Sequence, residues 1–270
     1  MSVDLNLAGA FYAALASADV PRLYEILHPE FVGHVSEGMP EGVGGTHHGP
    51  KAMLENVWGP IAHKFAVRPV PEHFLSCDDG KVVALGAYVG EPPDADRPLR
   101  ARFAHVLSFR EGRINELHQI TDTRQWSEVA SAQRLAVVRR MFAAVERRDP
   151  EMLLDTYAGD IEITEPASLP YGGVYHGHEG GMRHGIGYVN TWDPIQTPAD
   201  RQQDAVFLDA GEHVFVHWHQ KATLADGRHL DTPVLDIIEI QHEKVTSLQM
   251  FHRDTYTVLE FLGATRATAS

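Results

Sequence analysis

The sequence contains the same unit twice, and this repeat constrains the fold more than any other feature. Three blocks recur in the same order about 130 residues apart. The first pairs FYAALASAD, from Phe11, with MFAAVERRD, from Met141; the second pairs VGGTHHG, around Gly44, with YGGVYHG, around Gly172. The third pairs FAHVLSFREGRINELHQITDT with VLDIIEIQHEKVTSLQMFHRDT. Chance does not produce three matches in one order, so the chain is a tandem duplication with its joint near residues 127–133.

The repeat predicts two domains, over residues 1–126 and 134–262. The joint between them, SEVASAQ, is polar and lacks Pro and Gly, which favours a short helical or turn-like connection over a flexible linker.

Each copy contains helical spacing first and strand patterns afterwards. Apolar residues recur with helical spacing over residues 6–27 and 134–157, and each stretch is broken by an Asp that predicts two helices meeting at a turn. Weaker helices are expected over residues 50–62 and 178–190. Helices followed by a meander of antiparallel strands predict an α+β unit whose sheet curls around the helices. The expected long strands cover residues 81–89, 101–109, 113–121, 213–224, 232–240 and 244–252.

Composition narrows the range of partners. Across 270 residues the formal net charge is −14, which argues against nucleic acid and against an anionic membrane surface, and favours a small neutral or weakly polar ligand. The single cysteine, Cys77, cannot form an internal disulfide or a thiolate metal site, so we expect a reducing, cytoplasmic location. The apolar run near the N-terminus follows an acidic leader, MSVD, and is therefore expected to be a helix of the mature protein rather than a secretion signal. We expect a monomer or a homodimer.

Each half resembles the cone-shaped α+β fold of nuclear transport factor 2, which is shared with ketosteroid isomerase, SnoaL-like polyketide cyclases and limonene epoxide hydrolase. The resemblance rests on FYAALASAD, EITEPASLPYGGVYHGHEG, the last strand pair and the closing Asp-Thr, and it covers nearly the whole chain. It implies two tandem cones, packed through their sheets as a pseudo-twofold intrachain dimer. The glycine run would form the turn from the first strand into the third helix, where Gly permits positive φ. Because one fold supports many reactions, the site needs its own argument.

The resemblance implies an acid–base site in the second half. Glu165, followed by Pro166, matches the general-base Asp-Pro of ketosteroid isomerase, and Asp236 matches the protonated Asp of its oxyanion hole. Two carboxyls in one apolar cavity acquire different pKa values, so one acts as a base and the other donates a proton. Met141 stands where the isomerase has a donor Tyr, so the chain is not expected to be a steroid isomerase in the strict sense. Replacement donors would be Tyr175, His176 or His252, and the cavity walls would include Phe142, Trp218, Leu235 and Met250.

An alternative interpretation gives these carboxylates structural roles, with Glu165 facing solvent at a strand end and Asp236 in a structural pair. The first half offers a second candidate site, because imidazole titrates near neutral pH. There His34-Val35 replaces Thr164-Glu165, and His105 replaces Asp236. A cavity with these two histidines would also hold His47, Tyr12 and Asp122. A lone His on a strand is often structural, so one half would catalyse while the other completes the interface.

A metal site is the least favoured alternative. His217 and His219 lie on one face of a strand and could bind Zn or Fe together with His229 or His252. The matching residues of the first copy are Gly86 and Tyr88, and the Glu that would complete a cupin-like signature is absent. We therefore expect no metal, and no sequence motif calls for an organic cofactor.

Three classes of function follow. The leading one is a cofactor-independent acid–base enzyme acting on a polyketide, terpenoid or steroid-like molecule, as an isomerase, cyclase, dehydratase or epoxide-opening hydrolase. The second is a small-molecule binding or scaffold protein, and the third is a metal-dependent enzyme.

Overall fold

The computed structural model describes residues 3–263. They divide into two compact units, with the boundary between Ala132 and Gln133. The boundary falls inside one continuous helix, α5 (Thr123–Arg147). The connection is thus helical and longer than the short segment predicted, because the polar joint carries no Pro or Gly to end the helix. No described helix is both long enough and apolar enough to span a lipid bilayer.

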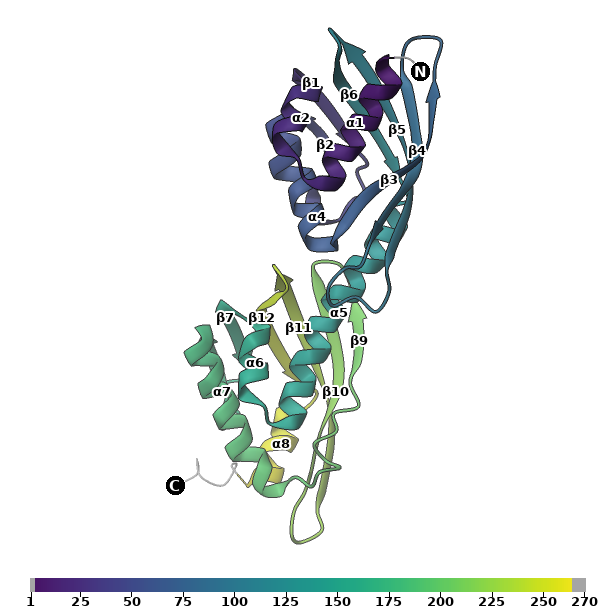
Figure 1. The fold of residues 1–270 in the computed structure, drawn as a ribbon. Coiled ribbons are helices and arrows are strands. Elements are labelled where there is room, and N and C mark those ends of the chain that lie inside the picture. The colour runs from purple at the N-terminus through teal and green to yellow at the C-terminus, as the bar shows by residue number, and fades with distance from the viewer. Residues whose placement is uncertain (1–2, 264–270) are drawn as a thin grey trace. The chain divides into compact units, whose positions relative to one another are not determined.

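The first unit begins with helices and continues as a six-stranded sheet (Figure 1). The strand order is β2-β1-β6-β5-β4-β3, and α1 packs against β3, β4 and β6. The elements are α1 (Val3–Ser17), α2 (Val20–Ile26), β1 (Leu27–Val35), η1 (Pro40–Gly42), β2 (Gly45–His48), α3 (Pro50–Met53), the π-helical η2 (Leu54–Trp58), α4 (Gly59–Phe65), β3 (Val67–Ser76), β4 (Val82–Gly90), β5 (Leu99–Arg110) and β6 (Arg113–Thr121).

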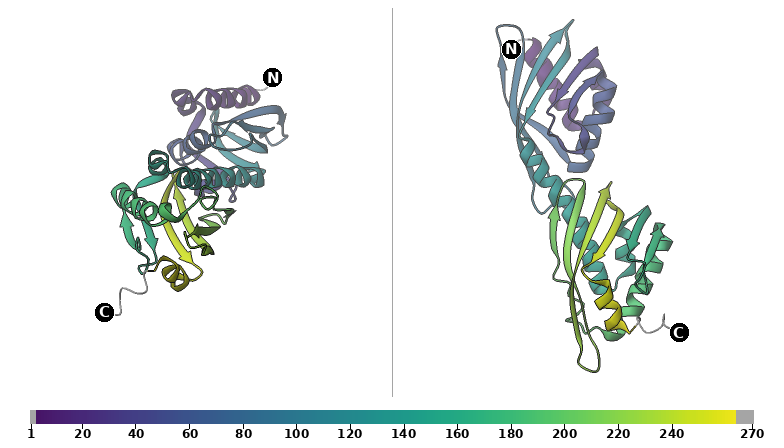
Figure 2. Two further views of the ribbon diagram at one scale, coloured as in Figure 1. Left: turned by 90° about the horizontal axis from the view of Figure 1, so that it is seen from below. Right: turned by 180° about the vertical axis from the view of Figure 1, so that it is seen from behind.

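The second unit repeats this topology, with the order β8-β7-β12-β11-β10-β9. In each unit the sheet curves and its helices gather against one face (Figures 1 and 2). The predicted α+β cone and its duplication are confirmed, whereas the pairing of the two cones stays a prediction. The elements are the C-terminal part of α5, α6 (Pro150–Thr156), β7 (Tyr157–Glu165), β8 (Gly173–His176), α7 (Gly177–Trp192), η3 (Asp193–Ile195), β9 (Val206–Asp209), β10 (His213–Thr223), β11 (His229–Gln241), β12 (Lys244–His252) and α8 (Thr255–Leu262).

The strand pairing differs from a simple meander at one place in each sheet. β1 pairs in parallel with β6, and β7 pairs in parallel with β12, while the other neighbours are antiparallel. The last strand therefore lies beside the first, which brings the end of β7 next to the end of β12. This juxtaposition places Glu165 beside His252.

Aspartates cap the helices that follow the predicted breaks. The Asp19 carboxylate accepts a hydrogen bond from the Arg22 N–H at 3.0 Å, and Asp149 accepts one from the Met152 N–H at 2.9 Å. Each cap satisfies a free N–H group at the start of a helix, so the predicted helix pairs are confirmed.

The glycine run forms a short strand, β2 or β8, rather than the turn that the sequence predicts. A Cβ on Gly172 would lie 2.0 Å from the Pro166 carbonyl oxygen, so only glycine permits this close approach. Gly49 and Gly177 follow the short strands with φ of +86° and +67°, where the chain turns into the next helix. The positive φ expected in this run therefore occurs both at the start of each short strand, at Gly45 (+105°) and Gly173 (+138°), and directly after it.

Candidate functional site

A cavity of about 340 Å³ lies inside the second unit. Helices α5, α6 and α7 and strands β10, β11 and β12 supply its lining, which is mostly apolar. A volume of this size suits a small organic ligand. Its apolar lining includes Met141, Phe142, Leu153, Leu154, Ile186, Val189, Trp218, Leu248 and Met250.

Asp236 projects into this cavity from β11. Alternation along the strand points Val234, Asp236 and Ile238 inward together, and Asp236 is only 3% exposed. Burial raises the pKa of its carboxyl well above the ordinary value, and the Glu165 charge acts in the same direction. The Trp218 indole lies close enough to oppose this rise in part, although its Nε1 does not reach hydrogen-bond geometry. Asp236 therefore holds its proton to a higher pH than an exposed aspartate does.

Two buried polar atoms in the cavity lining, one carboxyl oxygen and one indole nitrogen, have no hydrogen-bond partner in the described part of the chain. Within residues 3–263, neither Oδ1 of Asp236 nor Nε1 of Trp218 makes a hydrogen bond. Leaving such atoms unpaired in an apolar space costs on the order of 1–3 kcal/mol each. A polar atom of a bound ligand could partner both of them.

Glu165 ends strand β7 and lies between two histidines. Its Oε2 is 3.2 Å from Nε2 of His184 on α7, and its Oε1 is 2.8 Å from Nε2 of His252 at the end of β12. Burial by itself would raise the pKa of Glu165, but the hydrogen bonds and charges of these histidines outweigh it and lower the pKa. Glu165 is therefore an ionised carboxylate, although it is only 2% exposed.

His184 connects Glu165 with the cavity. Its ring lines the cavity, whereas Glu165 and His252 lie behind the lining. Because an ionised carboxylate only accepts hydrogen bonds, Nε2 of His184 must carry the donated proton. Nδ1 of a neutral His184 is then a proton acceptor, and no described residue hydrogen-bonds to it. This dyad can act as a general base.

His184 was not predicted from the sequence, although helical spacing offered a signal. The buried face of α7 contains Gly181, His184 and Trp192. These positions recur every three to four residues or at multiples of that spacing, as one face of a helix requires. A histidine within such a face, next to a strand ending in Glu, marks a candidate dyad.

The structure brings some of the predicted residues of the second half together and separates others. Phe142, Trp218 and Met250 line the cavity with Asp236. Tyr175 packs its ring against His184 at 5.2 Å between centroids, but its hydroxyl donates to the Tyr171 carbonyl at 2.7 Å, so it is not the expected free donor.

Two predicted site residues lie outside the cavity. Leu235 is 39% exposed, because a strand turns the neighbour of the inward Asp236 to the opposite face. His176 lies at the N-terminal end of α7 with 69% of its side chain exposed, 3.6 Å from Glu162. Neither residue can contact a ligand bound beside Asp236.

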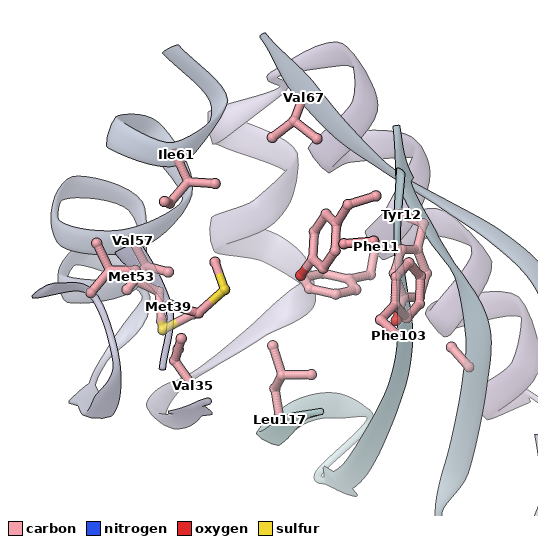
Figure 3. Close-up of a cluster of buried hydrophobic side chains, with 14 of the residues drawn as sticks. Phe11, Tyr12, Val35, Met39, Met53, Val57, Ile61, Val67, Phe103 and Leu117 are labelled. Carbon is pink, nitrogen blue, oxygen red and sulfur yellow. The ribbon is translucent and has the colours of Figure 1, made fainter. Parts of the chain in front are cut away.

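The first unit is closed at the position of the second unit's cavity. Its corresponding space measures about 50 Å³. Val35 takes the position of Glu165 and lies among Met39, Met53 and Leu117 in the apolar cluster (Figure 3). This unit therefore lacks both the volume and the carboxylate of the second one.

His105, the counterpart of Asp236, is held in a buried network. Its Nδ1 is 2.8 Å from the Tyr12 hydroxyl and its Nε2 is 3.1 Å from the Tyr88 hydroxyl, to which Gln119 donates at 2.9 Å. Burial lowers the pKa of His105 to about 3, so the ring is neutral. Both ring nitrogens are occupied, which gives His105 a structural role.

The other residues of that candidate site do not meet His105. His34 neighbours the inward Val35 and so points to the outer face of the sheet, where it contacts Glu116. His47 lies 2.9 Å from the Val43 carbonyl. Asp122 is exposed and accepts from the N–H of Gln125 at the start of α5. The predicted grouping of these residues in one cavity is wrong.

The His217 and His219 pair also lacks the ligands proposed for it. His219 lies 2.5 Å from an Asp231 oxygen, and His229 contacts Thr223. His217 is exposed on the outer face, whereas His252 points inward to Glu165. Within residues 3–263 these histidines form no group of three metal-binding side chains.

Comparisons with known proteins match each half of the chain separately. A family profile described as a SnoaL-like domain matches residues 8–117 and again residues 138–248. No curated protein matches the chain.

Similar solved structures include an NTF2-like protein of unknown function from Burkholderia pseudomallei, with 25% identity and a TM-score of 0.44, covering 48% of this chain and 98% of that one. The protein Bal32a from a soil-derived mobile gene cassette is 22% identical, with a TM-score of 0.43, over 47% of this chain and 95% of that one. TerC, co-crystallised with polyporic acid, is 18% identical, with a TM-score of 0.43, over 48% of this chain and 98% of that one.

Proposed function

Since the chain belongs to the SnoaL-like domain family, in which it carries the domain twice, we propose that its second unit is a cofactor-independent acid–base enzyme acting on a hydrophobic small molecule. At the matching position the first unit holds a space of only about 50 Å³, and it serves as a structural partner in this proposal. The observation that carries the proposal is that Asp236 and His184 both line one apolar cavity, with Glu165 behind His184 at 3.2 Å, and that the two carboxyl pKa values are shifted in opposite directions.

His184 is the proposed base. Glu165 fixes its tautomer through Nε2, so Nδ1 can accept a proton from a substrate in the cavity. The imidazolium that forms is stabilised by the ionised Glu165. This assignment moves the base role predicted for Glu165 to the residue in front of it, and Glu165 becomes a positioning residue.

Asp236 is the proposed acid. As a neutral carboxyl it can donate a hydrogen bond to a substrate oxygen that gains negative charge, and the Trp218 N–H can donate to the same oxygen. A base and an oxyanion-stabilising acid in one cavity suit proton removal next to a carbonyl group. Isomerisation, aldol-type cyclisation and dehydration each contain such a step.

The cavity restricts the substrate class. With a volume of about 340 Å³ and walls that are mostly aliphatic and aromatic, it suits a fused bicyclic or tricyclic ketone of polyketide, terpenoid or steroid type. Epoxide opening needs a water activated by a carboxylate or imidazole, and His184 could serve this role as well. A ligand-binding protein without catalysis is the second candidate, because the cavity alone suffices for binding.

Proton exchange tests the proposal without knowledge of the natural substrate. The probe is 2-tetralone, a bicyclic ketone with acidic protons next to its carbonyl, incubated with the intact chain in D₂O and followed by NMR. We expect deuterium incorporation faster than in buffer, and loss of this acceleration in His184→Gln. Binding of 2-naphthol, a phenol that resembles the enolate, without any accelerated exchange would favour the binding protein. Absence of both would refute the assignment of this cavity.

A further inference from the structure

The outer face of the first sheet carries a cluster that the proposed function does not use. His34 lies on β1, and Glu116 and His118 lie on the adjacent β6. His34 pairs in register with His118, and Glu116 is two residues away on the same face. One nitrogen from each histidine and one carboxylate oxygen lie within 4.8 Å of one another.

The spacing in this cluster matches that of ligands around one small cation. Oε1 of Glu116 is 3.1 Å from Nε2 of His118 and 3.4 Å from Nε2 of His34. Ligands with bonds of about 2.0–2.1 Å in a tetrahedral shell are themselves about 3.3–3.4 Å apart. Both imidazoles thus already present one nitrogen to the same carboxylate oxygen.

Neighbouring hydroxyl groups contact the ring nitrogen of His34 and the carboxylate oxygen of Glu116 that do not face the cluster. Thr46 Oγ1 lies 3.2 Å from Nδ1 of His34, and the Ser108 hydroxyl donates to Oε2 of Glu116 at 3.0 Å. These contacts leave Nε2 and Oε1 for an ion. Hydrogen bonds of this outer kind orient ligands in metal sites.

Ring stacking on His34 orients the third side chain of the cluster, His118. The rings of His34 and His118 stack with centroids 4.2 Å apart and planes 19° apart.

The second unit provides an internal comparison. The matching outer positions there are Thr164, Ser247 and Gln249, with Gln249 in register with Thr164. The same fold thus forms without the three ligands, so the sheet does not require them. The cluster belongs to the first copy alone.

We propose that His34, Glu116 and His118 form a surface site for a divalent transition-metal ion such as Zn²⁺. Two imidazoles and one carboxylate are donors that suit Zn²⁺, and the solvent-facing side leaves room for a water as the fourth ligand. The site lies on the opposite face of the sheet from the interior of the first unit and is independent of the acid–base chemistry proposed for the second. The histidine pair first considered for a metal, His217 and His219, is not part of it.

Metal titration of the intact, tag-free chain tests this site. After EDTA treatment and dialysis, the protein is titrated with Co²⁺ under calorimetry and visible spectroscopy, and bound Co²⁺ is then displaced with Zn²⁺. We expect one Co²⁺ to bind per chain, with a visible spectrum that indicates a low coordination number for the bound ion. His34→Thr and His118→Gln install the residues of the second unit at a half-buried and an exposed position, and each should weaken binding more than about 10-fold.

Two further variants sharpen the outcome. Ser108→Ala, which frees one carboxylate oxygen, should weaken binding by about 10-fold. His217→Gln, an exposed histidine of the second unit, should leave the affinity unchanged. Unfolding curves of the metal-free variants check that each is folded. The proposal is overturned if no stoichiometric binding occurs, if His34→Thr and His118→Gln bind like the original chain, or if His217→Gln removes the binding.

Discussion

The buried acid Asp236 predicts an unusual dependence of stability on pH. In the folded chain this carboxyl keeps its proton above the pH at which an unfolded chain releases it, because burial raises its pKa. Unfolding therefore releases a proton, and rising pH favours the unfolded state. Asp236→Asn keeps the shape of the side chain and removes this titration, so the variant should gain stability relative to the original chain as pH rises.

The magnitude follows from linkage. Above the pKa of an unfolded Asp, about 3.9, and below the folded pKa, the free energy of unfolding of the original chain should fall relative to the variant by about 1.4 kcal/mol per pH unit. The difference should stop growing where pH passes the folded pKa. That plateau would measure the pKa of Asp236 directly.

The assay is urea unfolding of both proteins at half-unit steps from about pH 4.5 to 7.5. Hydrogen exchange of peptides from β11 and β12, read by mass spectrometry, reports the second unit separately from the first. Asp160→Asn, an exposed acid on β7, is the control for the loss of one carboxyl group. If the Asp236→Asn difference does not change with pH, the folded carboxyl is ionised throughout, and its role as proton donor has to be abandoned.

Three further predictions concern the two units. His184→Gln should lower the rate of proton exchange of 2-tetralone by about 10²–10⁴. Glu165→Gln acts only through the imidazole, so it should lower the rate by less and alter its pH profile. Equal losses with unchanged pH profiles would contradict the Glu165–His184 dyad. Gly172→Ala, whose Cβ would lie 2.0 Å from a backbone oxygen, should destabilise the chain by about 1–3 kcal/mol or more in urea unfolding, whereas Gly159→Ala, with open space around it, should cost far less. Tyr12→Phe in the first unit should leave exchange unchanged, and a clear loss would place chemistry there.

The repeat and the strand alternation predict most of the fold, and they also expose two errors in the predicted site. Residues next to each other on a strand point to opposite faces. Leu235 therefore cannot share a cavity with Asp236, and His34 cannot share one with the residue that matches Glu165, namely Val35. The alternation of each strand itself contains this information.

Other features depend on contacts that no local pattern encodes. His184 reaches Glu165 because two glycines, Gly180 and Gly181, let α7 pack closely on Tyr175 and Tyr157. The edge strand β3 was not predicted, because its two prolines interrupt the strand pattern and are tolerated only at a sheet edge. The volumes of the two interiors depend on packing from distant segments and cannot be obtained from one sequence.

The closed network around His105 has a consequence for how such a chain can change. In a single-copy enzyme, substitutions that tighten the interior compete with the space that a substrate needs, which is the usual conflict between stability and activity. In a duplicated chain that catalyses in one copy only, the other copy does not have to keep space for a substrate and is free of this conflict. The first unit is therefore where we expect stabilising substitutions to be tolerated without loss of turnover, and its interior is the better starting point for engineering a more robust protein.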